Sequence, residues 1–262
     1  MPASTAVGES HLGTSPFRPC VLVPVYNHEG TLDSLVDRLR CCGLPCILVD
    51  DGSDVACRDT MVRLRQREAA WVRLVRHGTN QGKGAAVITG LRTAAADGFT
   101  HAVQIDADAQ HSTDDVPKFL DAARRNPLAV IAGCPEYDTS VPRARLYGRY
   151  ATLIWVWINT LSLEIRDAMC GFRVYPIAPT LALADRVRLG TRMEFDAEVI
   201  VRLSWDGVRV VNLSTPVTYR VDGVSHFRLW RDNLRISRMH ARLFFGMLRR
   251  LPHLLLRRWR AA

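Results

Sequence analysis

The 262-residue sequence predicts an α/β protein built on a mostly parallel sheet. Short apolar runs, each the length of a buried strand, alternate with stretches of helical periodicity up to residue 105. Polar, largely acidic segments follow those runs directly, as expected where parallel strands end at one edge of a sheet. A hydrophobic content of 48% suits a protein with a buried core. The longest apolar runs are much shorter than the roughly 18 residues of a membrane-spanning helix, which disfavours an integral membrane protein.

The first half of the chain predicts a regular alternation of strand and helix. The expected strands are 20–25, 46–49, 71–75 and 101–105, and the expected helices are 31–40, 57–68 and 84–96. In the first helix, Leu32, Leu35, Val36 and Leu39 recur at helical spacing. Strands joined by helices predict a parallel sheet with right-handed crossovers.

After Asp106 the alternation weakens. We next expect a helix at 114–125, a strand at 128–133, a loop at 134–149 and an aromatic-rich helix at 150–163. These are followed by a helix at 193–204, strands at 208–213 and 217–221, and a helical stretch at 227–260 that is broken at Pro252. The helix at 150–163 suits either the core or a membrane interface, where Trp and Tyr are common. We therefore expect a flexible leader at 1–18, one domain at 19–225 and a basic amphipathic tail at 226–262.

Charge is concentrated in the tail. The net charge is +9, yet residues 1–135 carry 14 basic and 15 acidic side chains, whereas residues 220–262 carry 11 Arg and 2 Asp. The tail interleaves arginine with Leu and Phe, which favours an anionic bilayer surface over nucleic acid. We expect a peripheral protein on the cytoplasmic face of the cell membrane.

The seven cysteines lie at irregular positions, so a disulfide framework is not expected. A metal site at Cys41, Cys42 and Cys46 is disfavoured too, because no second Cys/His pair follows at zinc-site spacing. Reduced, mostly buried thiols are the simplest expectation.

Asp106 and Asp108 are the most informative residues. They follow an apolar run and are separated by one residue, so both carboxylates can reach one ion at a strand end. Oxygen ligands suit Mg²⁺ or Mn²⁺, and Gln110 offers a neutral one. A solvated acidic turn would have the same spacing, but the other polar strand ends expected at this edge favour the metal site.

The loop from Gly78 to Gly84 resembles a phosphate-binding loop without matching either common pattern. The spacing between Gly78 and Lys83 is one residue too short for a P-loop, and Val87 stands where the dinucleotide pattern needs its third glycine. What remains is a lysine between two glycines at a helix N-terminus, a place that attracts anions. The turn that follows the expected strand 46–49 contains Asp51, whose carboxylate is suited to the N–H groups of a nucleobase.

Together these segments resemble the family 2 glycosyltransferases with a GT-A fold, in particular the polyprenyl-phosphate branch that contains dolichyl-phosphate mannosyltransferases. The matching stretches are 23–27, 49–53, 80–84, 104–111 and 170–173. The resemblance extends from about residue 20 to about residue 226. It implies a single Rossmann-like domain and the transfer of a sugar, with inversion, from a UDP- or GDP-linked donor to a lipid-type acceptor.

The resemblance also implies roles for individual residues. Pro24, Tyr26 and Asp51 would line the base and ribose, with Lys83 beside the nucleotide. Asp106, Asp108 and Gln110 would hold Mg²⁺ or Mn²⁺ on the donor diphosphate.

Arginines and a second group of acids complete the expected site. Arg145, Arg149 and Arg173 are candidates for contacts to donor or acceptor phosphates. If the acceptor is a hydroxyl, Asp196 is the preferred general base and Glu194 the alternative. A lipid phosphate is already an anion and needs no base.

Two other functions stay open at this point. A sugar-phosphate nucleotidyltransferase also combines a Gly/Lys loop with paired aspartates, but it normally carries glycines directly after the first strand, where this chain has Tyr26 and Asn27. A non-catalytic module that binds a membrane or nucleic acid through the tail is the other alternative. The sugar, the base, the acceptor and the oligomeric state are not determined by the sequence.

Overall fold

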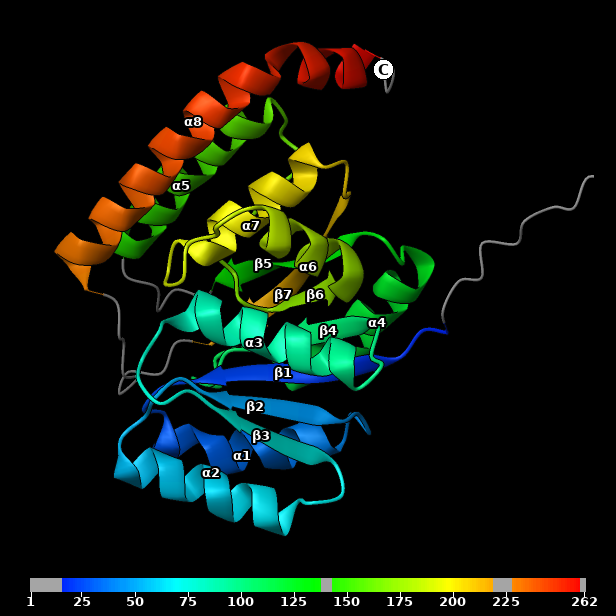
Figure 1. Ribbon diagram of the computed structural model, residues 1–262, viewed down its shortest axis with the longest axis vertical. Helices are drawn as coiled ribbons and strands as arrows, with labels where there is room; N and C mark the ends of the chain where they lie inside the picture. The colour runs from blue at the N-terminus through cyan, green and yellow to red at the C-terminus, as the bar shows by residue number, and fades with distance from the viewer. Residues whose placement is uncertain (1–15, 138–142, 219–227, 260–262) are drawn as a thin grey trace, which may run out of the picture.

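The computed structural model describes residues 16–137, 143–218 and 228–259. Within them, seven strands form one sheet in the order β3-β2-β1-β4-β6-β5-β7 (Figure 1). The strands are β1 (Pro19–Val25), β2 (Cys46–Asp50), β3 (Val72–Arg76), β4 (His101–Gln104), β5 (Val130–Tyr137), β6 (Arg173–Pro176) and β7 (Val210–Val217). Only β6 runs against its neighbours, β4 and β5, so the predicted mostly parallel sheet is confirmed.

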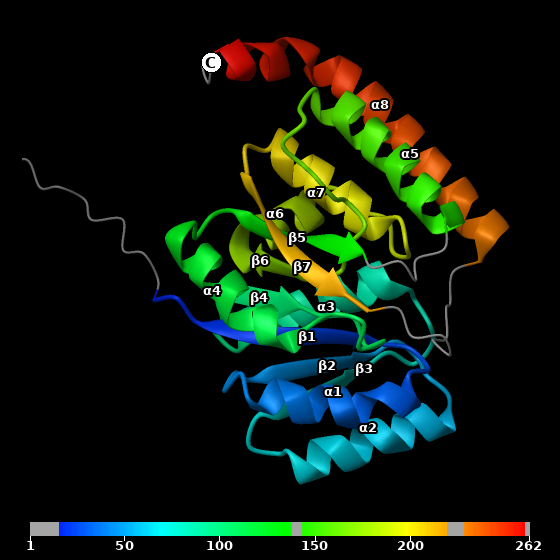
Figure 2. The same cartoon turned by 180° about the vertical axis from the view of Figure 1, so that it is seen from behind.

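Helices cover both faces of the sheet. They are α1 (Glu29–Arg40), α2 (Val55–Arg67), α3 (Lys83–Ala96), α4 (Val116–Arg125), α5 (Arg143–Thr160), α6 (Ile177–Arg186), α7 (Phe195–Trp205) and α8 (Leu229–Trp259), with a 3₁₀ turn at Thr113–Asp115. Helices α3, α6 and α7 lie on the face seen in Figure 1, and α1 and α4 lie on the face seen in Figure 2. Helices α5 and α8 lie side by side in both views, outside α7.

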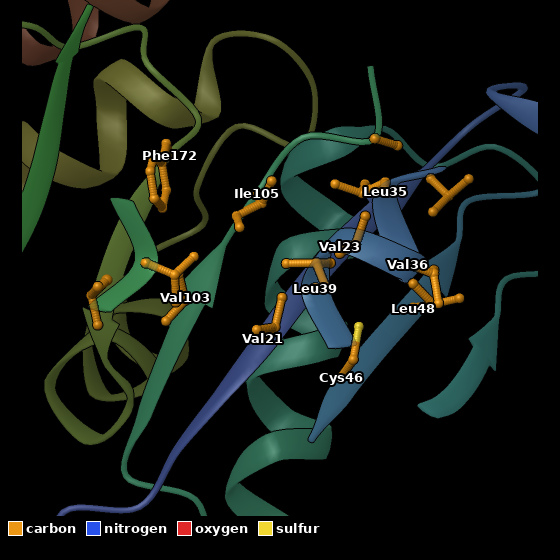
Figure 3. Close-up of a cluster of buried hydrophobic side chains, with 14 of the residues drawn as sticks. Val21, Val23, Leu35, Val36, Leu39, Cys46, Leu48, Val103, Ile105 and Phe172 are labelled. Carbon is orange, nitrogen blue, oxygen red and sulfur yellow. The ribbon is translucent and has the colours of Figure 1, made fainter. Parts of the chain in front are cut away.

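The core shows how the apolar runs of the strands and the apolar face of the first helix pack together. Figure 3 shows side chains of β1, β2 and β4, including Val23, Leu48 and Val103, packed beside Leu35 and Leu39 of α1. All five are fully buried. Both faces of these strands are covered, which is why the strands are continuous apolar runs rather than alternating ones.

The order of the strands places the functional edge. The chain builds β1, β2 and β3 outward in one direction and then returns to place β4 on the other side of β1. In open α/β sheets, ligands bind beyond the carboxyl ends of the strands where the chain order reverses in this way. Here the ends of β1 and β4 mark that point.

Several element predictions need correction. Residues 134–149 are not one loop, because β5 extends to Tyr137 and α5 already begins at Arg143. The strand β6 and the helix α6 were not predicted. The predicted strands 208–213 and 217–221 are one strand, β7, which ends at Val217, and residues 219–221 lie outside the described part.

The predicted break at Pro252 is also wrong, because α8 continues through this residue. Proline inside a helix costs about 3 kcal/mol. Buried Leu254, just beyond it, belongs to the cluster that joins α5, α7 and α8, so packing offsets this cost. Figure 1 shows α8 bending near its carboxyl end, as a proline-containing helix does.

The seven cysteines are free, as expected. Among the described helices, none combines the length and apolar character that would let it cross a membrane. The expected leader falls mainly on residues 1–15, outside the described ranges, while Phe17 already packs against the core.

Candidate active site

Three segments that follow strands meet at the carboxyl edge of the sheet. The backbone N–H of Asn27, after β1, donates to Ser53 Oγ, after β2, at 3.1 Å. Thr31 Oγ1 donates to the carbonyl oxygen of Ala107, after β4, at 2.6 Å. The convergence of polar strand ends that the sequence predicts is therefore present.

Asp51 organises the loop between β3 and α3. One carboxylate oxygen lies 2.8 Å from His77 Nδ1 and accepts the N–H of Gln81 at 2.9 Å. The other accepts from Asn80 Nδ2 at 3.0 Å and from the N–H of Gly82 at 2.7 Å. A carboxylate has about four acceptor positions. With these protein contacts to both oxygens, Asp51 supports the lysine loop, and the nucleobase contact implied by the resemblance stays a prediction.

Lys83 lies at the start of α3 and joins two parts of the site. Its Nζ is 2.9 Å from the Asp106 carboxylate and 2.8 Å from Asp196 Oδ2, and its side chain is 16% exposed. Burial alone would lower the pKa of the ammonium, but the charges of the two carboxylates outweigh burial and raise it. Lys83 is therefore a cation held between the Asp106 carboxylate, which follows β4, and the Asp196 carboxylate of α7.

The aspartate turn after β4 brings two carboxylates together. Burial alone would raise the pKa of Asp106, but the Lys83 charge outweighs burial and lowers it. Burial, and next the nearby charge of Asp106, raise the pKa of Asp108. The N–H of Gln110 donates to Asp108 Oδ1 at 3.1 Å, and its carbonyl oxygen accepts from Thr218, just after β7, at 3.1 Å.

This turn offers oxygen ligands to a divalent cation, but the described residues add no larger group of metal-binding side chains. In the part of the chain that the structure describes, no group of three or more His, Cys, Asp or Glu side chains is placed to bind a metal. The donor set is therefore the two carboxylates, and the backbone N–H of Gln110 binds one of them. Burial, and after it the charge of Asp106, raise the pKa of Asp108, and a divalent cation bound to both carboxylates would relieve the repulsion between them. An all-oxygen set suits Mg²⁺ or Mn²⁺.

Gly171 lets the chain before β6 pass directly against Asp106. A Cβ atom at this position would lie 2.1 Å from Asp106 Oδ2, closer than any side chain permits. Because β6 is antiparallel to β4, the residues that precede it lie at the same edge as those that follow β4. The sequence contains this glycine in the 170–173 stretch, but no functional role was assigned to it.

Arg173 does not reach the edge as a free cation. It is fully buried, and its guanidinium donates to the carbonyl oxygens of Asp196 at 2.6 Å and Ala168 at 2.8 Å and to the Tyr175 hydroxyl at 3.2 Å. Arg173 therefore holds the backbone at Asp196, in contrast with the phosphate contact expected from the sequence.

The three acids around α7 differ in their contacts. Asp196 Oδ2 faces Lys83, and Asp196 Oδ1 is buried without a hydrogen-bond partner. Glu194 lies at the helix start against Gly190, where a Cβ would be 2.4 Å from its Cγ. Glu198 is fully buried and pairs with Arg202 and Arg242. Among them Asp196 alone faces the Lys83 ammonium.

The other expected residues have these positions. Arg149 forms an ion pair with Asp167 at 2.6 Å, and Asp167 in turn accepts the N–H groups of Met169 and Cys170. Pro24 is buried within β1, and Tyr26 is half-buried just beyond it. The Arg145 side chain lies outside the described residues.

Arg192 was missed in the sequence. Its guanidinium donates to Asn80 Oδ1 at 2.7 Å, so it holds the lysine loop from the opposite side to Asp51. In a chain whose 35 basic residues are nearly all arginine, no sequence signal distinguishes Arg192 from the others.

Comparison with known proteins identifies the family. Residues 20–187, well over half of the chain, match the family described as Glycosyl transferase family 2. The chain belongs to this family. The family 2 glycosyltransferase described here is 25% identical over 197 residues to the UDP-N-acetylglucosamine–dolichyl-phosphate N-acetylglucosaminyltransferase of Methanococcus voltae, a match covering 69% of this chain and 78% of the relative. It is 27% identical over 208 residues to the undecaprenyl-phosphate mannosyltransferase of Micrococcus luteus, covering 77% and 83%.

A solved structure supports the fold of this glycosyltransferase. The glucosyl-3-phosphoglycerate synthase of Mycobacterium tuberculosis, in complex with Mn²⁺ and UDP-glucose, superposes with a TM-score of 0.60 at 17% identity, covering 90% of this chain and 79% of that chain. The predicted GT-A fold is confirmed.

Proposed function

We propose that this family 2 glycosyltransferase transfers a sugar from a nucleoside-diphosphate donor to a lipid-linked acceptor, either a polyprenyl phosphate or a lipid hydroxyl. The observation that carries the proposal is the contact of Lys83 with both Asp106 and Asp196, beside Asp108, at the edge where the strand order reverses. Two relatives are named for transfer to dolichyl and undecaprenyl phosphate, which supports this acceptor class.

The leaving group sets the main chemical demand. As the bond from the anomeric carbon to the diphosphate breaks, negative charge grows on the phosphates and needs compensation. Asp106, Asp108 and Gln110 would hold Mg²⁺ or Mn²⁺, which supplies Lewis-acid stabilisation of that charge. Lys83 keeps Asp106 ionised and in place, and Gly171 lets Asp106 lie against the backbone.

Asp196 has one of two roles, depending on the acceptor. For a hydroxyl acceptor, its unpartnered Oδ1 takes the proton as the hydroxyl oxygen attacks. For a phosphate acceptor no proton moves, and Asp196 instead positions Lys83 beside the incoming anion.

The tail helix α8 supports a peripheral position on the inner face of the cell membrane. At about 100° per residue, its side chains divide into three sectors. The buried sector contains Met239, Leu243, Met247 and Leu254. The opposite sector, an arc of about 100°, contains the exposed apolar side chains Trp230, Leu234, Phe245, Leu248, Leu255, Leu256 and Trp259.

Between these two sectors lies a basic flank formed by Arg231, Arg235, Arg238, Arg242 and Arg249. The only acid of α8, Asp232, is buried. Beside α8, helix α5 also exposes Tyr150 and Ile154. Aromatic side chains next to arginines suit the headgroup level of an anionic bilayer. This surface of α8 carries no exposed acid, whereas two proteins that meet through complementary charges would need acids as well as arginines.

A donor screen tests the proposal. The purified full-length protein is incubated with UDP- and GDP-linked sugars, Mg²⁺ or Mn²⁺ and a membrane lipid extract, and release of nucleoside diphosphate is followed. We expect release that depends on one donor, on the metal and on the lipid extract. The variant Asp108→Asn should lose nearly all of this activity. Unchanged transfer by Asp108→Asn in the presence of a chelator would refute the metal role.

A further inference from the structure

A fully buried carboxylate, that of Glu198, connects three elements behind the site. It accepts the backbone N–H of Gly190 at 2.8 Å, it pairs with Arg202 of its own helix at 2.8 Å, and it pairs with Arg242 of α8 at 3.2 Å. A buried carboxylate is stable only when it is paired and hydrogen-bonded. The position of Glu198 is therefore set jointly by α7, α8 and the segment before α7.

The segment held by Glu198, residues 190–192, closes on the lysine loop; we call it the clamp. The carbonyl oxygen of Thr191 accepts the N–H of Ala85 in the first turn of α3 at 3.1 Å. A Cβ on Gly82 would lie 2.4 Å from this same oxygen, so the two segments are in direct contact. Arg192 adds its bond to Asn80.

Contacts therefore run without interruption from α8 to Lys83. Arg242 contacts Glu198, Glu198 holds Gly190, and the clamp packs on the residues on either side of Lys83. Removing Arg242 would leave Glu198 with Arg202 as its only charged partner among the described residues, while the Gly190 bond would lose part of its support. The Arg242 side chain is 56% exposed, so its replacement leaves no cavity in the core.

We propose that Glu198 is a positioning residue for the nucleotide-binding loop, and that Arg242 makes the setting of this loop depend on how α8 is seated. The assignment of the loop to nucleotide binding rests on the proposed function. The coupling of α8 to the clamp rests on the contacts alone.

Hydrogen exchange of the full-length protein, without ligand or membrane, tests the coupling directly. In Arg242→Gln we expect the amides of Gly190 and Ala85 to exchange about five- to tenfold faster than in the wild type, as for a loss of about 1–1.4 kcal/mol of local protection. The matched control is Arg63→Gln. Arg63 is 57% exposed and pairs with Asp33 at 2.9 Å, but it lies on α2, remote from the clamp. Equal exchange at Gly190 and Ala85 in both variants would overturn the proposal.

Nucleotide binding separates positioning from general stabilisation. Using uridine and guanosine diphosphate with Mn²⁺ as probes in calorimetry, we expect Arg242→Gln to weaken the tighter-binding nucleotide about fivefold, while Arg242→Lys, which keeps the charge, restores most of the affinity. A fivefold loss that Arg242→Lys does not reduce at all would contradict a charge-based link. If the wild type binds neither nucleotide, the proposed function fails, whereas the exchange experiment still decides the coupling.

Discussion

Lys83 satisfies two carboxylates that arrive from distant parts of the chain. Asp106 follows β4 and Asp196 belongs to α7, and each lies within 2.9 Å of the ammonium. Without this cation the buried Asp196 and the half-buried Asp106 would lack their shared counter-charge, and one of them would take up a proton or move away. Lys83 thus fixes the charge state of the site before a ligand binds.

We therefore expect Lys83→Met to reduce sugar transfer by about 100-fold or more, in the range found when a group that stabilises developing charge is removed. Steady-state transfer with the donor identified by the screen measures this. The control is Lys118→Met, because Lys118 is the only other lysine and its Nζ donates to the carbonyl oxygen of Ser214, away from the turn. Full activity in Lys83→Met would mean that the ion pairs are purely structural.

Gly171 offers a second test at the scale of one atom. In Gly171→Ala the new methyl group would occupy the space of the Asp106 carboxylate, so we expect Mn²⁺ affinity to fall by about tenfold or more, equivalent to about 1.4 kcal/mol. Calorimetric Mn²⁺ titration provides the measurement. Gly148→Ala is the matched control, since nothing lies within 4 Å of a Cβ there and alanine favours a helix. Equal Mn²⁺ affinity in the two variants would argue against Asp106 as a ligand.

At the scale of elements, the contact between α5 and α8 contains a buried histidine. His240 stacks on Trp155, with ring centroids 6.1 Å apart, and its Nδ1 lies 3.4 Å from Asn159 Nδ2. Burial lowers the pKa of His240 to about 4. The folded protein therefore keeps this ring neutral at pH values where the unfolded chain, with a pKa near 6.5, already binds a proton.

The contribution of His240 to stability is complete above about pH 6.5 and is lost as the pH falls toward 4. Over that range we expect it to remove about 2–3 kcal/mol from the free energy of unfolding. Urea unfolding at a series of pH values should show this slope in the wild type and a smaller one in His240→Gln. The exposed His253, also on α8, supplies the control variant His253→Gln. Parallel pH profiles for wild type and His240→Gln would contradict the assignment.

How far the sequence predicts each element depends on the local signal. Strands β1, β2 and β4 are buried on both faces and appear as apolar runs, so they were predicted to within a residue or two. Strand β6 has four residues and follows a stretch without periodicity. Its direction, and hence the presence of Gly171 at the functional edge, arises only from pairing with β4.

The site residues also divide into those with a local sequence signal and those without one. Asp106, Asp108 and Lys83 were predicted to lie together because parallel strands end at one edge of a sheet, and the structure places them together there. The protein contacts of Asp51 and the burial of Arg173 both depend on residues distant in the sequence. His77 is 26 residues from Asp51, and Asp196 is 23 residues from Arg173. No local pattern encodes such contacts.

At the scale of the whole molecule, the three sectors of α8 lead to a prediction of binding to anionic membranes. We expect the full-length protein to sediment with vesicles that contain anionic phospholipid but not with purely zwitterionic vesicles, and to be released by salt. Reversing the charge of Arg231 and Arg249 to Glu should weaken this binding by at least about tenfold, because each basic residue near the surface contributes about 1 kcal/mol.

The matched control reverses Arg65 and Arg125, which are exposed on α2 and α4, and so gives the same net charge on other elements. If both double variants lose binding equally, total charge rather than α8 determines attachment. Salt-insensitive binding, or self-association of the protein without vesicles, would point instead to a protein partner or a second copy on the exposed apolar sector.

The start of α8 lies on the same side of the molecule as the amino end of α3, which carries Lys83 (Figure 1). An enzyme seated on the bilayer through this helix would meet its acceptor by lateral diffusion within the lipid plane. Turnover would then follow the mole fraction of acceptor among the surrounding lipids, so that adding inert lipid at constant total acceptor would slow the reaction.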